Sequence, residues 1–549
     1  MDQAIRPGRK MRQFIAAILI ALTAAGCNQS IAPATQTVIL DINGDLYHTL
    51  GSEESSCFAE ACYEAVINDL LRDGNFASRQ EAEAELKSGC YTIYSTVDPI
   101  IQEALDREAK NPANFPEQNL AAKEASQALY ESQGELEELI VQLAGAVIHN
   151  DTGHVAAIIG GREESGASYS QNRALKKLCI GTSASPLTVY APGFDTKDLS
   201  LASSFNDVKT DFAGYVPLNQ PNVYSGMASC RAGIRNSVNT ITVHALYEVG
   251  FEASVDYSQK FGFEISSEDE KSADALALGN FAQGQTPLAL ASAYSVFPNG
   301  GFRHEPAFYT RIADANGKTI AQSSNDEVQV ISAQAAFITT EALKQAANGG
   351  TAVVSVIGQE VGGKTGDANN GQAAIFAGFT KEYTGAFWFG YDYQRIEGIE
   401  LYLETTAGYD KSPALFWQKV FTSFYREKRL PNALLPQKPN DVAIAEVDSV
   451  SGKAPSELSH HDPRGSQVVS EYFIEGTYPS EEDDIHVLLT VCSETWQLAS
   501  ENCLAEIQVF IDKDIGKLYK SGIMPIDPDF VPDWEADYIK PVDICEMQH

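Results

Sequence analysis

The chain has 549 residues, of which 44% are hydrophobic and 21% are charged, a balance typical of globular proteins with a sizeable core. Asp and Glu outnumber Lys and Arg by 74 to 39, which gives a formal net charge of −35. Such a surface repels phosphate backbones, so nucleic acid binding is not expected, and solubility is the simpler role for the charge.

The N-terminus has the pattern of a secretory signal over residues 1–26. An apolar run at residues 14–22 follows Arg12 and ends in small residues before Cys27. This run is shorter than a membrane span requires. The ending LTAAGC resembles a bacterial lipoprotein box, which implies cleavage before Cys27 and lipidation of its thiol. An uncleaved anchor helix is the alternative, and residues 27–55 are expected to form a tether.

Export makes the other cysteines candidates for disulfide bonds. Eight remain besides Cys27, an even number that fits full pairing but does not define the connectivity. No C-x-x-C pair or H-E-x-x-H pattern occurs, and the adjacent His460 and His461 lie in a polar stretch typical of solvated side chains. We therefore predict no metal and no cofactor. The eight are Cys57, Cys62, Cys90, Cys179, Cys230, Cys492, Cys503 and Cys545.

Strands and helices are predicted in turn before residue 140. The stretch TVILDI predicts a short strand, and residues 56–88 carry apolar residues at helical spacing. The stretch GCYTIYSTV predicts another strand. A helix then starts with Asp98 as its N-cap and Pro99 at its first position. Residues 110–138 are polar and Ala-rich, so further helix is expected.

Residues 143–162 predict a β-hairpin, because two apolar stretches flank the turn-forming sequence NDTG. Helical patterns dominate residues 173–297, and QTPLALASAYSVFPNGG has a Thr-Pro helix start and an Asn-Gly-Gly stop. After residue 350 the pattern becomes β, with AAIFAGFT and YTGAFWFGYDY joined by a short charged turn.

The stretch from Gly358 to Thr365 fits the Walker A pattern G-x-x-x-x-G-K-T. A phosphate-binding loop must follow a strand and open a helix, because the helix N-terminus and the backbone amides hold the phosphates. Here Lys-Thr-Gly is followed by DANNG and two predicted strands. We therefore reject the nucleotide-binding interpretation.

The order of the segments resembles the transpeptidase region of class A (bifunctional) penicillin-binding proteins. The resemblance extends from about residue 55 to residue 480. The stretches that carry it are YSTVDPIIQEAL, AGAVIHNDTGHVAAIIGGR followed by QNRAL, RNSVNTITVHALYEVG, ALALGNFAQGQTPLALASAYSVFPNGG, GGKTGDANNGQAAIFAGFTKEYTGAFWFGYD and EYFIEGTYP.

This resemblance implies an α+β fold, the penicillin-binding-protein transpeptidase or serine β-lactamase-like arrangement of an antiparallel sheet flanked by helices. A helical linker or pedestal is expected at residues 56–140, a transpeptidase-like domain at 141–435 and a small β-rich appendage at 436–549. Bifunctional members also carry a glycosyltransferase before the linker. No E-D-x-x-F-type motif precedes residue 55, so glycan polymerisation is not expected.

Penicillin-interacting enzymes use three motifs, S-x-x-K, S-x-N and K-T-G. The first Ser must lose its proton to attack a carbonyl, and a Lys one helical turn away serves as the base. The resemblance implies that the S-x-N residues relay protons and orient the substrate, and that K-T-G binds the substrate backbone and carboxylate. The matching residues here are Ser237 and Asn239, and Lys364, Thr365 and Gly366.

The first motif is degenerate. The family pattern G-S-x-x-K-P falls on GTSASP, so Thr182 stands at the nucleophile position and Ser185 at the base position. A slip of one residue would make Ser183 the nucleophile. No register within residues 179–190 supplies a lysine. Loss of one member of a cooperating catalytic unit costs up to about 10⁶ in rate.

We therefore predict a catalytically impaired, lipid-anchored pseudoenzyme at the outer face of the cytoplasmic membrane or in the periplasm. Its partners would be peptidoglycan stem peptides, a non-covalently bound β-lactam or a cell-wall synthase. One alternative is an active D,D-transpeptidase or carboxypeptidase that uses Thr182 or Ser183. Another is a purely structural envelope lipoprotein.

Two disulfide bonds are candidates, and the family fold implies the first of them. Cys179 precedes the degenerate motif and Cys230 precedes S-x-N, and the fold brings these segments together, so we predict a Cys179–Cys230 bond. Two separately buried thiols are the alternative. In the tail, a bond between Cys492 and Cys503 would close a short loop.

Overall fold

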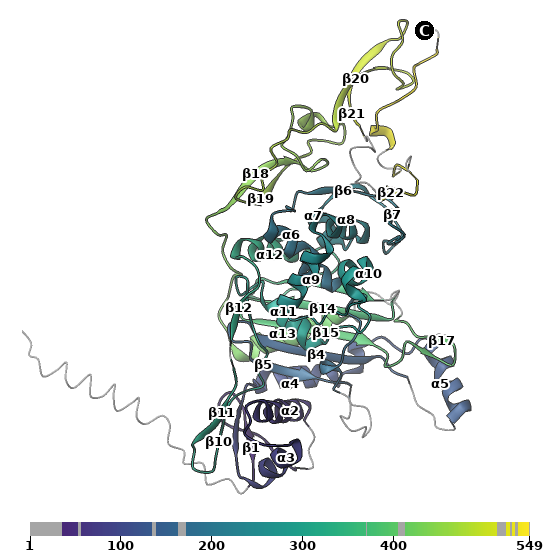
Figure 1. Cartoon of the computed structure of the whole chain (residues 1–549). Coiled ribbons are helices and arrows are strands. Elements are labelled where there is room, and N and C mark those ends of the chain that lie inside the picture. Colours follow the sequence, from purple (N-terminus) through teal and green to yellow (C-terminus); the bar gives the residue numbers. More distant parts are fainter. Residues whose placement is uncertain are drawn as a thin grey trace, which may run out of the picture.

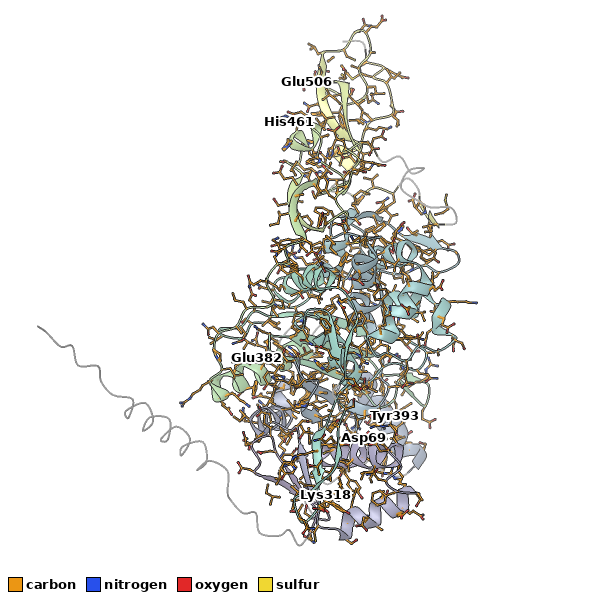
Figure 2. All side chains as sticks on the ribbon, turned by 60° about the vertical axis from the view of Figure 1, so that its left-hand side comes forward. Asp69, Lys318, Glu382, Tyr393, His461 and Glu506 are labelled. Atoms are coloured by element: carbon orange, nitrogen blue, oxygen red, sulfur yellow. The ribbon has the colours of Figure 1, made fainter. Side chains whose placement is uncertain are left out.

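The molecule is elongated, with an N-terminal unit at one end, a sheet and a helical lobe in the middle, and β-hairpins at the other end (Figure 1). Lys318 and Glu506 mark the two ends in Figure 2, with Glu382 between them. The predicted signal and Cys27 lie outside the described residues. This computed structural model describes residues 36–52, 56–133, 139–162, 172–324, 326–368, 371–403, 412–512, 523–527, 530–532 and 536–547.

The N-terminal unit packs two helices on a five-stranded sheet with the strand order β11-β10-β3-β1-β2. Ser56 and Ser78 accept hydrogen bonds from the first-turn amides of α2 and α3, which explains where these helices begin. Strand β3 pairs with β10, more than 200 residues later in the chain. The elements are β1 (Val38–Leu40), β2 (Leu46–Thr49), α2 (Cys57–Arg72), α3 (Arg79–Ser88), β3 (Thr92–Ser95), β10 (Tyr309–Ala313) and β11 (Thr319–Gln322).

The central sheet is antiparallel, with the strand order β13-β14-β15-β4-β5. Trp388 of β15 packs with the core of the helical lobe, whereas its neighbours Phe387 and Phe389 pack with the core that includes α13. Alternate side chains of one strand therefore fill two cores, one on each face of the sheet. The elements are α4 (Pro99–Ala109), α5 (Leu120–Gln133), β4 (Gln142–His149), β5 (Val155–Ile159), β13 (Gly362–Ala368), β14 (Ala373–Phe379), β15 (Tyr383–Gly390), β16 (Arg395–Ile396), β17 (Ile399–Glu400) and α13 (Pro413–Lys428).

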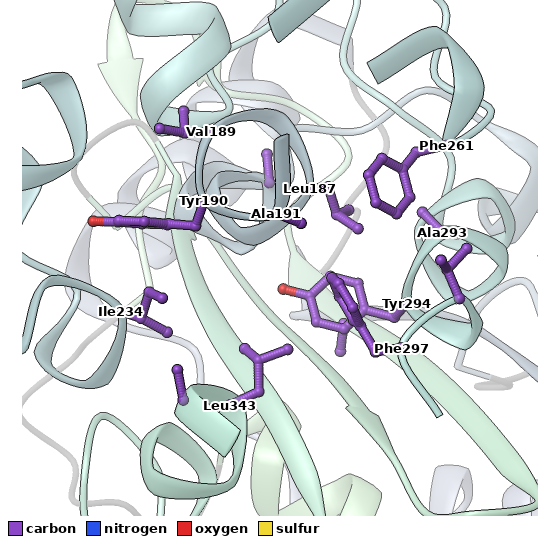
Figure 3. Close-up of a cluster of buried hydrophobic side chains, with 14 of the residues drawn as sticks. Leu187, Val189, Tyr190, Ala191, Ile234, Phe261, Ala293, Tyr294, Phe297 and Leu343 are labelled. Atoms are coloured by element: carbon purple, nitrogen blue, oxygen red, sulfur yellow. The ribbon is translucent and has the colours of Figure 1, made fainter. Parts of the chain in front are cut away.

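The helical lobe covers one face of this sheet, and its core is aromatic and aliphatic (Figure 3). Tyr190 and Tyr294 are both fully buried, and each hydroxyl has a partner, Thr242 Oγ1 at 2.9 Å and the Ser183 carbonyl at 2.6 Å. The elements are η3 (Gly181–Ala184), the π-helical turn η4 (Pro186–Tyr190), α6 (Ala191–Thr196), β6 (Ser204–Asp207), β7 (Thr210–Phe212), β8 (Gly226–Ser229), α7 (Cys230–Asn236), α8 (Asn239–Val249), α9 (Phe251–Lys260), α10 (Ala273–Leu278), α11 (Pro287–Ser295), β9 (Phe302–His304), β12 (Glu327–Gln329) and α12 (Ala333–Ala347).

The C-terminal region extends away from the helical lobe as two antiparallel hairpins, β18–β19 and β20–β21 (Figure 1). A late strand, β22, returns to pair with β7 of the lobe. Across the described part of the chain, no helix has the length and apolarity that a bilayer span requires. The elements are β18 (Val442–Asp448), β19 (Val468–Ile474), β20 (His486–Cys492), β21 (Ala505–Ile511) and β22 (Ile523–Pro525).

The predicted α+β class, with an antiparallel sheet between helices and a β-rich C-terminal appendage, is confirmed. The hairpin predicted at residues 143–162 is β4–β5. Asp98 and Thr286 cap α4 and α11, each followed by proline at the first helical turn. The Walker-like lysine lies inside strand β13 and not before a helix, which agrees with rejecting a phosphate-binding loop.

Candidate active site

A cleft of about 1280 Å³ lies where the helical lobe meets the edge of the central sheet. It is open to solvent and mixes polar and apolar side chains. Its wall includes Thr182 from η3, Ser237 and Asn239 from the α7–α8 junction, and Thr365 and Gly366 from β13. The three separate motifs of the sequence therefore converge on one cavity.

Two glycines, one in β13 and one at the end of α10, allow the η3 turn to pack closely between these elements. A Cβ at Gly366 would lie 2.3 Å from the Ile180 carbonyl oxygen, and one at Gly279 would lie 1.9 Å from the Gly181 carbonyl oxygen. Real Cβ atoms do not approach oxygen so closely. The position of Thr182 is thus fixed by backbone-to-backbone packing on both sides.

The three hydroxyls of the degenerate motif have different surroundings. Thr182 is half-buried and lines the cleft. Ser183 is fully buried and donates a hydrogen bond to the Ile180 carbonyl at 2.7 Å. Ser185 is 2% exposed and donates to the Thr182 carbonyl at 2.9 Å. The hydroxyl of this segment that faces the cleft is therefore that of Thr182. Ser185, at the position of the base, only stabilises the turn through its hydrogen bond.

Ser237 links Thr182 to the buried amine of Lys364. Ser237 Oγ lies 3.1 Å from Thr182 Oγ1, and Lys364 Nζ lies 2.7 Å from Ser237 Oγ. Ser237 ends α7 in the left-handed region with φ +56°, which turns its hydroxyl toward the cleft. Asn239, at the start of α8, donates from Nδ2 to the Leu218 carbonyl at 2.7 Å. Since hydroxyl protons rotate, this chain of hydrogen bonds can run in either direction.

Lys364 is 1% exposed, although it lies beside an open cleft. Its ammonium group donates to Ser237 and to the Thr365 carbonyl, the latter at 3.0 Å. Burial lowers the pKa of Lys364 to about 7, because the charged form loses its hydration. At neutral pH a large fraction of this amine is therefore unprotonated and able to accept a proton through Ser237.

One wall of the cleft is formed by β13, which is an edge strand of the central sheet. An edge strand can pair with an extended peptide through its free backbone groups. Thr365 Oγ1 donates to Thr351 Oγ1 at 2.6 Å, which orients the Thr365 hydroxyl. Sequence reasoning did not find Thr351 or the cleft-lining Asp367. Thr351 lies in a loop that contains no recognisable motif, so the sequence gives no signal for it. Asp367 directly follows K-T-G, and its position next to this motif could have predicted that it lines the cleft.

The predicted Cys179–Cys230 disulfide is absent from the structure, in which both residues are thiols. Cys230 is fully buried in the lobe core at the start of α7. Cys179 instead packs at the edge of that core, with its sulfur 3.7 Å from Asn280 Oδ1. The structure thus agrees with the alternative of two separate thiols. The predicted Cys492–Cys503 bond is absent too, since the structure contains no disulfide among the cysteines it describes.

Metal-binding residue types do not gather in the cleft. Within the described ranges, the groups of His, Cys, Asp and Glu close enough to share a metal ion lie in the C-terminal hairpins. The hydroxyls of Thr182 and Ser237 and the amine of Lys364 are groups suited to proton transfer and nucleophilic attack.

Two family descriptions match the chain. Residues 144–395 match the penicillin binding protein transpeptidase domain, and residues 438–488 match the penicillin-binding protein 1A C-terminal domain. Penicillin-binding protein 1A of Clostridium botulinum is 32% identical over 501 residues, covering 87% of this chain and 56% of that protein. Penicillin-binding protein 1F of Bacillus subtilis is 31% identical over 350 residues, covering 63% of this chain and 45% of that protein. The chain thus spans about half the length of these relatives.

Solved structures share the fold. Penicillin-binding protein 1A from Haemophilus influenzae has a TM-score of 0.59 at 20% identity, covering 79% of this chain and 78% of that one. The PonA1 protein from Mycobacterium tuberculosis, in complex with penicillin V, has a TM-score of 0.55 at 19% identity, covering 72% of this chain and 97% of that one. At these identities the likeness concerns the fold alone.

Proposed function

This chain is a class A penicillin-binding-protein-like protein with a transpeptidase domain at residues 144–395, and from this premise we propose that it acts in peptidoglycan synthesis as a stem-peptide-binding protein with impaired acyl transfer. The observation that carries the proposal is the contrast between the two sides of the cleft. The side formed by β13 and the α7–α8 junction keeps its recognition groups. The side formed by η3 has no base next to its hydroxyl.

Recognition is supported by groups suited to an extended peptide that ends in a carboxylate. The free edge of β13 offers backbone pairing, and the Thr365 hydroxyl is held in place by Thr351. A carboxylate bound near Lys364 would favour the protonated amine and so gain a charge-assisted contact. The same groups suit the carboxylate of a β-lactam bound without a covalent bond.

Impaired acyl transfer is supported by the residue that stands where the S-x-x-K motif has its lysine. In the S-x-x-K arrangement a lysine amine removes the proton of the nucleophile directly. Here Ser185 stands at that position, and its hydroxyl donates a hydrogen bond to the Thr182 carbonyl. Thr182 is also β-branched, which restricts the rotation that attack on a carbonyl requires. A missing general base lowers rates by about 10²–10⁴-fold.

A second candidate function is slow acyl transfer by Thr182. The Thr182–Ser237–Lys364 chain of hydrogen bonds favours it, because the two contacts of 3.1 and 2.7 Å join a hydroxyl to an amine whose pKa burial lowers to about 7. In this alternative the proton of Thr182 passes to Ser237 Oγ while the proton of Ser237 passes to Lys364 Nζ.

Two measurements on the purified protein test these candidates together. Intact-mass spectrometry after incubation with benzylpenicillin should show no added mass, and calorimetry should show binding of a synthetic stem peptide. Thr365→Val should weaken that binding, while Thr319→Val, an exposed threonine of β11, should leave it unchanged. An adduct that maps to Thr182 would establish the second candidate. Absence of peptide binding would favour a purely structural envelope lipoprotein.

We also propose that Cys27 is lipidated and holds the protein at the outer face of the cytoplasmic membrane or in the periplasm. The support is the apolar run and the LTAAGC ending of the sequence. A membrane-anchored protein that binds stem peptides but transfers acyl groups poorly would be suited to act together with a cell-wall synthase. Metabolic labelling with a radioactive fatty acid tests the anchor, since Cys27→Ala should abolish the label.

A further inference from the structure

Three cysteines from separate segments meet in the C-terminal region. Cys492 ends β20, Cys503 lies in the loop before β21, and Cys545 lies in the last described segment, 536–547. Their sulfur atoms all lie within 4.8 Å of one another. Cys492 and Cys545 are buried, at 0% and 2% exposure, and Cys503 is half-buried. The group therefore has two interior ligands and one that opens toward solvent.

Backbone hydrogen bonds bring the three segments together. The amide of Leu498 donates to the Asp543 carbonyl, and the amide of Cys545 donates to the Leu498 carbonyl, both at 2.9 Å. The amide of Trp496 donates to the Cys492 carbonyl at 2.9 Å and closes the turn after β20. The last segment is thus held against this turn by its main chain, independently of its sulfur.

The surroundings of two of these sulfurs favour the thiolate form. The Thr495 hydroxyl and the backbone amides of Glu494 and Thr495 donate hydrogen bonds to the Cys492 sulfur. The Ser500 amide lies 3.3 Å from the Cys503 sulfur, with the Ser500 hydroxyl at 3.2 Å. N–H donors aimed at sulfur stabilise a negative charge there.

We propose that Cys492, Cys503 and Cys545 bind one thiophilic divalent metal ion of the Zn²⁺ class. Zn–S bonds of about 2.3 Å in a tetrahedral site place sulfurs about 3.8 Å apart, so the observed group needs only a small contraction. A disulfide would use two of the three sulfurs and leave the convergence of the third unexplained. The neighbouring hydrogen-bond donors also suit a thiolate ligand better than a disulfide sulfur.

Binding of the metal ion releases protons from the thiols and involves no oxidation or reduction. Each thiol that still carries a proton releases it to solvent as its sulfur bonds to the metal, and no electron is transferred. Three thiolates and one Zn²⁺ leave a net charge of −1 at the site. A solvent oxygen would be the fourth ligand of a tetrahedral site.

The consequence is a cross-link among the β20–β21 hairpin, its connecting loop and the end of the chain. A two-stranded hairpin is marginally stable by itself, and this one lies far from the main core (Figure 1). A metal ion that joins three segments supplies stability that a small apolar core cannot. This inference does not depend on the proposed function of the cleft.

The test uses the full chain, reduced, treated with a chelator and exchanged into metal-free buffer. Titration with Zn²⁺, followed by elemental analysis after gel filtration, should recover one equivalent of zinc. Titration with Cd²⁺ should produce the ultraviolet charge-transfer absorption of cadmium thiolates, saturating at one equivalent. Cys492→Ser should lose the bound equivalent. Cys90→Ser, a partly exposed cysteine outside the group, should retain it.

A further measurement does not depend on the folding of a variant. In the wild-type protein, Zn²⁺ should slow alkylation of Cys503 at least tenfold while leaving alkylation of Cys90 unchanged. Failure of the reduced protein to retain either metal would overturn the proposal. Non-reducing peptide mapping of the protein as isolated that finds a disulfide between any two of the three cysteines would overturn it as well.

Discussion

Two buried basic side chains, Lys364 in the cleft and His486 in the C-terminal hairpins, have opposite electrostatic surroundings. Lys364 has hydroxyl and carbonyl neighbours, and burial lowers its pKa to about 7. Burial also acts to lower the pKa of His486, but hydrogen bonds to Asp462 and Asp483 outweigh it and raise the pKa to about 9. Asp448 lies 3.4 Å from the same imidazole and adds to this effect.

This difference shows that burial alone does not decide the role of a basic group. Lys364 has no carboxylate partner among the described residues and can exchange a proton near pH 7, which suits a chemical or recognition role. Surrounded by carboxylates, His486 stays charged and joins the end of β18 to the loops that carry Asp462 and Asp483. Arg464 adds a second cation to this group through Asp462, at 2.7 Å. The surroundings of Lys364 are therefore suited to a functional role, and those of His486 to a structural one.

The largest effect is expected from placing a lysine at position 185, where Ser185 now stands in the degenerate motif. The double variant Thr182→Ser with Ser185→Lys restores S-x-x-K, and a positioned general base should raise the rate of acylation by benzylpenicillin about 10²–10⁴-fold. Stopped-flow or fluorescent-penicillin labelling measures the rate. Thr182→Ser alone separates the effect of the nucleophile from that of the base. A correctly folded double variant that reacts no faster than wild type would show that more than this motif has been lost.

The second prediction concerns Lys364 and pH. The unfolded chain keeps its lysine proton up to about pH 10.5, whereas the folded protein loses it near pH 7, so the unfolded state binds more protons between these values. The contribution of Lys364 to stability should therefore rise by roughly 2–3 kcal/mol from pH 7 to pH 9. Urea unfolding of the wild type and of Lys364→Met at the two pH values measures this contribution, because other groups such as His486 titrate in both proteins.

Lys364→Met should remove that rise, because the variant has no titrating group at this position. Lys318→Met changes an exposed lysine and serves as the control, which should keep the wild-type slope. An unchanged slope in Lys364→Met would mean that the amine is charged in the folded protein, and the contrast with His486 would then be lost.

The third prediction has the opposite sign. The folded-state pKa of His486 is raised to about 9 from 6.5, so its contribution is fully present below pH 6.5 and is lost as pH rises toward 9. The C-terminal hairpins should lose about 2 kcal/mol over that interval. Hydrogen exchange of β20 peptides, corrected for intrinsic rates, follows it. His486→Gln should abolish the dependence, and His461→Gln, which changes an exposed histidine, should preserve it.

The smallest effect is expected at Thr351. Thr351→Val removes the partner of the Thr365 hydroxyl, and a net hydrogen-bond contribution of about 1 kcal/mol corresponds to a roughly fivefold loss of stem-peptide affinity. Calorimetry measures the affinity, with Thr319→Val as the exposed control. An unaffected Kd would indicate that the Thr365 hydroxyl does not contact the peptide.

Local sequence patterns predicted the elements that depend on neighbouring residues. The NDTG turn, the Asp98 cap and the Thr286 cap each have a mechanism confined to a few residues, and all three occur as expected. The pairing of β3 with β10 was not predicted, because strand partners so far apart in the chain leave no local signal. The Cys179–Cys230 bond, absent from the structure, was predicted from the proximity of two segments, which does not fix the direction of their side chains.

The candidate site was predictable as a set of motifs but not as a geometry. The family resemblance supplied the positions of Thr182, Ser237 and Lys364. Their spacing in the structure depends on the close approach of η3 to its glycine neighbours, and the low exposure of Lys364 depends on packing from several elements. Both are tertiary effects, so the lowered pKa of Lys364 had no signature in the sequence.

The left-handed backbone of Ser237 has a consequence for how the molecule distributes its free energy. At the end of α7 a glycine would adopt φ +56° without strain, whereas serine does so at a penalty of order 1 kcal/mol. Every folded molecule carries that penalty, whether or not a ligand occupies the cleft. The hydroxyl between Thr182 and Lys364 is thus kept in place at a conformational cost that the rest of the fold must offset.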